Sequence, residues 1–305
     1  MTIEVEKKQG NIAPNVNLRA FISLLVGGVA IGTAPILMRY ADVTPSSSAF
    51  WRLFLAIPIL SIWFAIDVRR NGRSQTPNLN FKQIRPFMLI GFFFAVDLAM
   101  WHWSVRLTTV ANATLLANMS AIFTAVGAFL FFGERFSKTF ISGMFLALLG
   151  AMALMGHSFN LSPDHLFGDL LGLTTAIAYA GYMIANASAR KKYSTVSIML
   201  GTAIFASIFL YPIAINEVGD FIPSTTEGWI PLVALALFPQ VIGQSLIIYA
   251  LAHLPAAFGS VSLLIQPIVA AILAWILFSE TLGLYHLVGA ALIISVIVLI
   301  KRGVR

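Results

Sequence analysis

The chain has 305 residues, of which 59% are hydrophobic and only 10% are charged. Soluble globular proteins average roughly 45–50% and about 25% for these two classes. So few charges cannot cover a soluble surface, and the composition therefore indicates an integral membrane protein with several spans. The complete lack of cysteine excludes a disulfide scaffold, a thiolate zinc site and an iron–sulfur cluster.

The N-terminal segment, residues 1–17, is polar and precedes the first apolar run. That run is not followed by the small-residue motif at which signal peptides are cleaved. We therefore expect residues 1–17 to form a cytoplasmic tail and the run at 18–39 to remain in the protein as its first span.

Apolar runs long enough to cross a bilayer recur along the whole chain. A membrane-spanning helix needs about 20 mostly apolar residues. The runs that meet this length, in chain order, are 18–39, 45–66, 86–106, 109–132, 138–157, 166–188, 195–216, 228–251, 256–278 and 282–300. They are about twice as long as the strands of a membrane barrel and do not alternate. The sequence predicts an all-α integral membrane protein with ten transmembrane helices.

Lysine and arginine are distributed unequally between the two sides of these spans. If the N-terminus is cytoplasmic, most of the 19 basic residues lie in inner connections, for example at 69–73 and 190–192. Outer connections instead carry acids such as Asp164, Glu217 and Asp220. The positive-inside rule then places both termini in the cytoplasm. A nucleic-acid partner is not expected, because no soluble basic face with interleaved aromatic residues is present.

An internal repeat becomes visible when Glu134 is aligned with Glu280, an offset of 146 residues (280 − 134). Gly143 then falls on Gly289, and both stretches have a span, an F-x-E turn and a second span. Chance matching in an alanine- and leucine-rich sequence is the alternative, but the shared turn favours duplication. Five spans per half, at 18–157 and 166–302 with an outer linker at 158–165, make the second half inverted. Inverted repeats typically enclose a substrate site near the midplane and rock to give alternating access.

The ten spans, the five-span halves and the turns F-G-E-R and F-S-E-T resemble the paired EamA domains of the drug/metabolite transporter superfamily. The resemblance extends over about residues 18–302. It implies a secondary transporter that exports small metabolites, and the pattern is similar to bacterial exporters of amino acids, including aromatic ones. Such halves also recur in carriers of sugars, nucleotides and drugs. The resemblance implies a small-molecule substrate and the lipid bilayer as partners, leaves the oligomeric state open, and is compatible with a monomer.

Polar side chains at bilayer depth usually face the bundle interior or a water-filled cavity. In the third span, Asp97 and Trp101 are four residues apart on one helical face, and His102 follows. We expect Asp97 and Trp101 to line a cavity and to bind an ammonium group by charge and by the indole ring. If transport uses protons, Asp97 is the first candidate carrier and His102 the second. The alternative is a carboxylate bonded to a neighbouring helix beside an interfacial aromatic belt.

Amides, phenols and prolines at similar depth in other spans supply further candidates. The predicted substrate-binding residues are Asn118, Tyr179, Tyr182, Gln240, Gln244 and Gln266, and the predicted hinges are Pro239 and Pro267. Proline removes a helix hydrogen bond, so a kink beside amides can bind a ligand or bend. Hydrogen bonds that join neighbouring helices are the alternative role for the amides and phenols.

Other features are expected to serve structure. Arg52, near the outer end of the second span, should extend to the lipid headgroups rather than bind a carboxylate. The small-residue pairs Gly28–Gly32 and Gly168–Gly172 should allow close helix packing.

Catalytic, metal and cofactor signatures are missing from the sequence: it contains no H-E-x-x-H, G-x-S-x-G or G-x-x-x-x-G-K-[ST] motif, and its five histidines lack metal-ligand spacing. We therefore expect a transporter rather than an enzyme. Export of lipophilic cationic drugs is the alternative, but similar small drug exporters carry an acid in the first span, which 18–39 lacks. A membrane-embedded enzyme is less favoured, because acids and histidines are spread along the chain.

Overall fold

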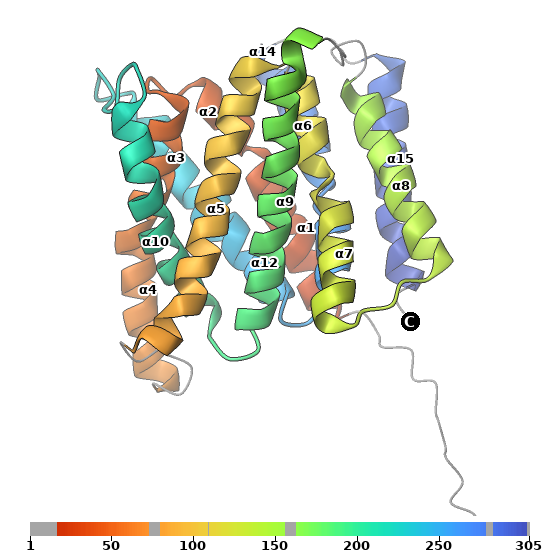
Figure 1. Ribbon diagram of the computed structural model, residues 1–305, viewed down its shortest axis with the longest axis horizontal. Helices are drawn as coiled ribbons and strands as arrows, with labels where there is room; N and C mark the ends of the chain where they lie inside the picture. The colour runs from red at the N-terminus through yellow and green to blue at the C-terminus, as the bar shows by residue number, and fades with distance from the viewer. Residues whose placement is uncertain (1–16, 73–79, 109, 156–162, 279–282, 304–305) are drawn as a thin grey trace, which may run out of the picture.

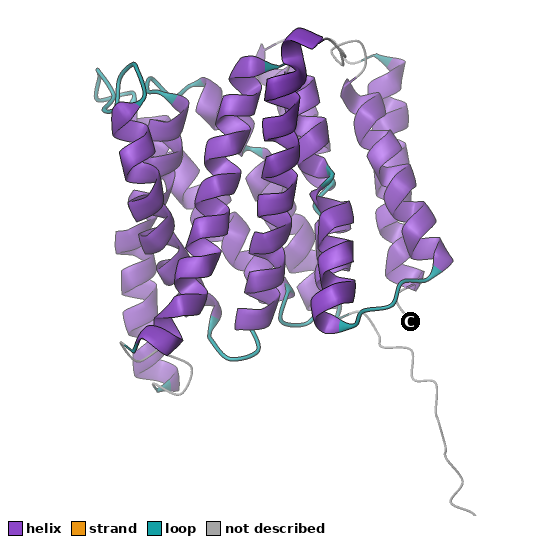
Figure 2. Cartoon of the chain, in the orientation of Figure 1, coloured by secondary structure: helices purple, strands orange, loops and turns teal. Residues whose placement is uncertain are grey.

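The computed structural model describes residues 17–72, 80–108, 110–155, 163–278 and 283–303. In these residues every regular element is a helix and no strand occurs (Figure 2). Most of the predicted tail at 1–17, most of the linker at 158–165 and Glu280 lie outside the described residues.

The helices stand roughly side by side in one bundle (Figure 1). In chain order they are α1 (Leu18–Gly32), α2 (Ala34–Arg39), α3 (Pro45–Phe54), α4 (Ala56–Asn71), α5 (Phe81–Leu107), α6 (Val110–Asn118), α7 (Ser120–Phe132), α8 (Lys138–Met155), the 3-10 turn η2 (Pro163–His165), α9 (Leu166–Ala189), α10 (Thr195–Asn216), α11 (Trp229–Leu235), the π-helix η3 (Ala236–Gln244), α12 (Ser245–Ala250), α13 (Ala256–Ser262), α14 (Ile265–Phe278) and α15 (Leu284–Gly303).

Helix starts carry the expected capping residues. Asn17, Thr44 and Ser194 precede α1, α3 and α10, and the side-chain oxygen of each accepts a backbone N–H of the first turn. Pro45 then occupies the first position of α3, where its missing N–H would have had no helical partner.

Eight of the described helices or helix stacks are long and apolar enough to cross a membrane, from Leu18–Arg39 to Ala256–Phe278. Two more apolar helices, Lys138–Leu154 and Leu284–Ile300, are shorter. The outer surface carries many exposed large apolar side chains, including Phe131 and Trp275, which suit lipid and not water. The prediction of a multi-span all-α membrane protein is confirmed, and the count of ten crossings stays a prediction.

Two of the predicted spans are interrupted just before a proline. The first breaks at Thr33 between α1 and α2, ahead of Pro35, and the second at Leu55 between α3 and α4, ahead of Pro58. A proline lacks the N–H that a helix needs and clashes with the carbonyl four residues back. At the first break, the Thr33 hydroxyl donates to the Ala30 carbonyl at 2.7 Å.

The fourth and ninth spans break at positions that agree to within one residue under the offset of 146 residues. In the fourth span α6 ends at Asn118 and α7 begins at Ser120, and in the ninth span α13 ends at Ser262 and α14 begins at Ile265. Asn118 corresponds to Leu264, which lies within the second break. Pro239 lies inside the π-helix η3, and Pro267 lies in the first turn of α14, directly after the second break. Both predicted hinge prolines therefore lie at or next to irregular backbone.

Glycines permit the closest helix contacts. A Cβ on Gly28 or Gly32 of α1 would lie 2.6 or 2.7 Å from side-chain atoms of α14, and one on Gly168 of α9 would lie 2.6 Å from the Leu107 backbone. These distances are far below van der Waals contact, which confirms the packing role predicted for both pairs.

The helices α8 and α15 pack against each other in opposite directions at one edge of the bundle (Figure 1). Gly143 of α8 lies against Ile300, whereas Gly150 lies against Gly289 and Ile293. A Cβ on Gly289 would meet the Gly150 carbonyl oxygen at 2.5 Å, so this helix pair requires glycine there.

Candidate functional site

A cavity lies inside the bundle between α1–α2, α3, α5, α6–α7, α9 and α13–α14, and the end of η3 also reaches it. Its volume is about 160 Å³, below the roughly 300–1,000 Å³ typical of sites for drug-sized ligands. Its walls are mainly apolar, with polar groups from both halves of the chain.

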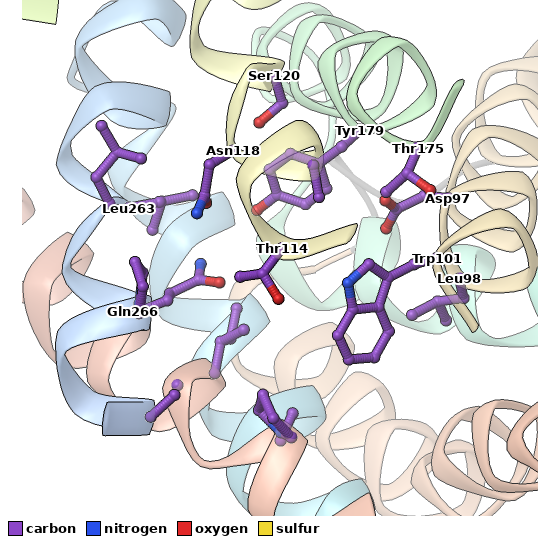
Figure 3. A pocket seen from close by; sticks show the side chains of 18 of the residues that line it. Asp97, Leu98, Trp101, Thr114, Asn118, Ser120, Thr175, Tyr179, Leu263 and Gln266 are labelled. Atoms are coloured by element: carbon purple, nitrogen blue, oxygen red, sulfur yellow. The ribbon is translucent and has the colours of Figure 1, made fainter. Parts of the chain in front are cut away.

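Most of the predicted site residues meet in this cavity. They are Asp97, Trp101, Asn118, Tyr179, Gln244, Gln266 and Pro267. Figure 3 shows how they approach from different elements: Asp97 and Trp101 from α5, Asn118 from α6, Tyr179 from α9 and Gln266 from α14.

The arrangement on α5 follows from helical periodicity. Phe94, Asp97, Leu98 and Trp101 are spaced by three and four residues, so one face of the helix presents all of them to the cavity. Phe94, Asp97 and Leu98 are buried, whereas Trp101 is half-buried. The carboxylate is therefore held in an apolar wall next to an indole.

Three predicted residues lie behind the cavity wall. Tyr182 is fully buried, its hydroxyl donates to Gln244 Oε1 at 3.0 Å, and its ring stacks on Phe94 with centroids 4.6 Å apart. Gln240 is also fully buried. The His102 ring is buried with Nδ1 bonded to the Leu98 carbonyl. These residues contact lining residues, and none of the three lines the cavity itself.

The expectation for Arg52 is wrong. Its side chain is only 6% exposed and lines the cavity instead of reaching the headgroups. Its Nε donates to Gln240 Oε1 at 3.1 Å, and its guanidinium carbon lies 5.8 Å from the centroid of the Phe94 ring. The inward direction has a physical reason, since a fixed acceptor and the Asp97 carboxylate compensate the charge inside the bundle. Ser48, one turn earlier on α3, is also buried, so a polar stripe on this helix was the available signal.

Arg52 and Asp97 are the two oppositely charged side chains among the described residues that line the cavity. Arg52 comes from α3 and Asp97 from α5. The cavity wall therefore carries one formally positive and one formally negative group on different helices. Such a wall complements a ligand that itself carries one positive and one negative group.

Several small polar residues of the wall were not singled out from the sequence. Thr114, Thr175 and Ser260 all line the cavity. The Thr175 hydroxyl and the Asn118 amide nitrogen are buried without a hydrogen-bond partner among the described residues. Buried polar atoms are normally paired, so these two mark places where a ligand or water would bind. Thr175 lies one helical turn before Tyr179, and that spacing could have identified it.

A polar network joins the ends of α3 and α5 to the segment after α10. Arg106 Nη1 lies 2.6 Å from Glu217 Oε1, and the Ser46 N–H donates to Glu217 Oε2 at 2.9 Å. Burial acts to raise the pKa of the Glu217 carboxyl, but the hydrogen bonds from Ser46 and the charge of Arg106 outweigh it and hold the pKa below its usual range. Trp51 adds a hydrogen bond from Nε1 to the Phe221 carbonyl at 2.8 Å.

A metal site has no support in the described part of the chain. Its histidine, aspartate and glutamate side chains form no group of three or more that could hold a metal ion.

Two stretches of the chain, residues 18–156 and 166–302, match the EamA-like transporter family. The uncharacterized transporter YetK of Bacillus subtilis is 23% identical over 95% of this chain and 88% of its own. The pseudopaline exporter CntI of Pseudomonas aeruginosa is 25% identical over 71% of this chain and 75% of its own. A probable terminal-alkyne amino-acid exporter of Streptantibioticus cattleyicolor is 26% identical over 66% of this chain and 67% of its own.

A solved crystal structure of a protein that is 15% identical superimposes with a TM-score of 0.78. The alignment covers 92% of this chain and 96% of that one. The two proteins therefore share a fold.

Proposed function

Because this chain belongs to the EamA-like transporter family, we propose that it is a secondary exporter of amino acids in the bacterial inner membrane. The relatives named as exporters support outward transport of small molecules, and one of them is named for an amino acid. The chain itself contains no ATP-hydrolysis motif, so an ion or substrate gradient drives the transport.

The observation that carries this proposal is the composition of the cavity wall. An amino acid offers a carboxylate, an ammonium group and a variable side chain, so its site needs donors, acceptors and a tolerant apolar surface. Gln244, Gln266 and Asn118 supply amides, Asp97 supplies a negative charge, and Trp101 supplies an aromatic wall. An indole facing an ammonium group adds about 0.5–2 kcal/mol by cation–π attraction.

Alternating access between two inverted five-helix halves is the mechanism that fits this site. In this proposal ten helices cross the membrane and both termini are cytoplasmic. Three features support it: the cavity takes residues from both halves, the breaks at Met119 and Leu263–Leu264 agree to within one residue under the repeat offset, and α8 runs antiparallel to α15. Irregular backbone at corresponding places in two repeats is typical of transporter substrate sites.

Proton coupling, where it occurs, is assigned to Asp97, with His102 second. Among the described residues that line the cavity, Asp97 is the one with a carboxylate. Intramembrane acids commonly relay protons in transporters. His102 is buried on the next turn of α5, with Nε2 unpaired among the described residues.

Export of lipophilic cations is the alternative, and the structure offers it less support. A cation would meet Asp97 and Trp101 favourably, but it would also meet the positive charge of Arg52 in the same cavity. Like charges at short range in a poorly solvated site repel strongly.

Uptake by proteoliposomes that contain the purified protein tests the proposal. The panel contains amino acids, amines and sugars, each measured with and without a proton gradient. We expect saturable flux of amino acids, and a loss of about three- to thirtyfold in apparent affinity for the Trp101→Ala variant. Saturable flux of amines alone would replace the proposal with the drug-export alternative, and flux of sugars alone would reject both.

A further inference from the structure

The position of Arg52 is fixed by a partner that uses only one of its donors. Gln240 accepts a hydrogen bond from Nε at 3.1 Å, and Gln240 is itself fully buried in the π-helix η3. A guanidinium carries five N–H donors in a rigid fork. Four of them, on the two terminal nitrogens, therefore remain without a protein acceptor among the described residues, although the side chain is 94% buried (100 − 6).

Unused donors of a buried arginine are costly unless a ligand or water pairs with them. Arg52 lines the cavity, so its terminal nitrogens have access to whatever the cavity holds. A planar fork of this kind matches the oxygens of a carboxylate or a phosphate, because two parallel hydrogen bonds form at once; the negative charge of Asp97 in the same cavity disfavours the more highly charged phosphate.

Asp97 on α5 provides the complementary charge. When the cavity is empty, the two side chains line the same cavity with opposite formal charges and attract each other across it. An amino acid carries its carboxylate and its ammonium group on one carbon atom. It can therefore pair with Arg52 and with Asp97 together, and it leaves neither charge unpaired in the loaded protein.

The geometry points to Arg52 as the residue that binds the carboxylate of the substrate, with the Arg52–Asp97 pair restricting the cavity to zwitterions. This inference rests on the proposed function and narrows its substrate class. Gln240 is a positioning residue, because it holds Nε and directs the remaining donors without touching the cavity.

Compounds with only one of the two charges should be rejected. A primary amine pairs with Asp97 but leaves Arg52 as an uncompensated buried cation, and a simple carboxylic acid leaves Asp97 as an uncompensated anion. Breaking a buried pair in this way is strongly unfavourable. The charge pair therefore acts as a filter on the net charge of the substrate, while the apolar wall accepts different side chains.

Equilibrium binding to the purified protein in detergent tests the filter. The probes are phenylalanine, phenethylamine, which lacks the carboxylate, and 3-phenylpropionate, which lacks the ammonium group; leucine, isopentylamine and 4-methylpentanoate form a second set. The parent should bind each amino acid at least about tenfold more tightly than either analogue. In Arg52→Gln the affinity for the amino acid should fall about 10- to 100-fold, while the affinity for the amine should rise, because the amine then leaves no buried cation uncompensated.

Two further variants separate charge from geometry. Arg52→Lys keeps the charge but loses the fork, so we expect it to retain part of the preference for the amino acid. Gln240→Leu keeps Arg52 but removes the oxygen that accepts the hydrogen bond from its Nε. The affinity for the amino acid should therefore fall by about three- to tenfold, and the affinity for the amine should fall less. Arg39→Gln is the matched control, because Arg39 is exposed and does not line the cavity.

A double variant, Arg52→Gln with Asp97→Asn, covers the case in which the single variant fails to fold. Removal of both charges leaves no uncompensated ion, so this protein should insert and melt like the parent. It should bind phenylalanine no better than phenethylamine or 3-phenylpropionate.

The outcomes distinguish the inference from the function it rests on. If the parent carries amino acids but the double variant keeps the full preference for phenylalanine, Arg52 does not read the carboxylate and the inference is overturned. If the parent binds phenethylamine and isopentylamine better than both amino acids, the inference and the proposed amino-acid function both fail. If the parent binds none of the six compounds, the proposed function is rejected, and the inference with it.

Discussion

Tyr182→Phe is the substitution for which the structure gives the most definite expectation. Phenylalanine keeps the ring that stacks on Phe94 and removes only the hydroxyl that donates to Gln244 Oε1 at 3.0 Å. Both partners are almost completely buried, Tyr182 at 0% and Gln244 at 1% exposure. The amide oxygen would therefore lose the donor that the buried Tyr182 hydroxyl supplies.

Two ranges bound the expected magnitude. Leaving a buried acceptor unsatisfied costs about 1–3 kcal/mol, whereas hydrogen bonds between membrane helices average about 0.6 kcal/mol with a maximum near 1.7. Complete burial favours the region where these ranges overlap. We therefore expect Tyr182→Phe to lower the free energy of unfolding by about 1–1.7 kcal/mol.

The measurement is reversible unfolding by titration with SDS in mixed micelles, carried out on the parent, Tyr182→Phe, Gln244→Leu and the double variant. The double variant should lose less stability than the sum of the singles, because the same bond is removed twice in that sum. Tyr211→Phe, at a 48% exposed position on α10, is the matched control and should change nothing. Strictly additive single effects would refute the assignment of this hydrogen bond.

Three more predictions concern topology, coupling and pH. A single cysteine at Arg70 of this cysteine-free chain should react with an impermeant thiol reagent only in inside-out vesicles, and reaction in intact cells would reverse the proposed orientation. Asp97→Asn should abolish the response of transport to a proton gradient while the protein still inserts, so an unchanged response in proteoliposomes would remove Asp97 from the coupling. Glu217 has a pKa below its unfolded value, so its stabilising contribution is present above the unfolded pKa and lost as pH falls through the lowered one. Unfolding at a series of pH values below about 4.3 should therefore show a loss of stability that is smaller in Glu217→Gln, and identical slopes would contradict this.

Much of the architecture follows from local sequence properties. Span positions depend on hydropathy over about 20 residues, and the described helices occupy the predicted runs. Asp97 and Trp101 could be placed on one face because helical spacing is a local rule, and the prolines marked irregular backbone near 239 and 267 for the same reason.

Other features depend on partners that are distant in the sequence. The break at Met119 contains no proline, so no local signal predicts it. It lies within one residue of the position that the repeat offset relates to the break at Leu263–Leu264. The direction of Arg52 was predicted wrongly, because the rule that arginine extends to the headgroups assumes that nothing inside compensates its charge. Inside the bundle its Nε pairs with Gln240, 188 residues away, and the opposite charge of Asp97 lies on another helix of the same cavity; no local pattern records these partners.

Protection of a cavity cysteine by substrate tests the central claim most directly. Thr175→Cys and Ser260→Cys place single thiols on the cavity wall, on α9 and α13, and Asn71→Cys on exposed α4 serves as the control. In purified protein, a saturating concentration of a transported amino acid should slow the modification of both cavity thiols by a small permeant reagent and leave the control unchanged. Equal rates with and without that amino acid at both cavity positions would contradict the claim that the substrate binds there.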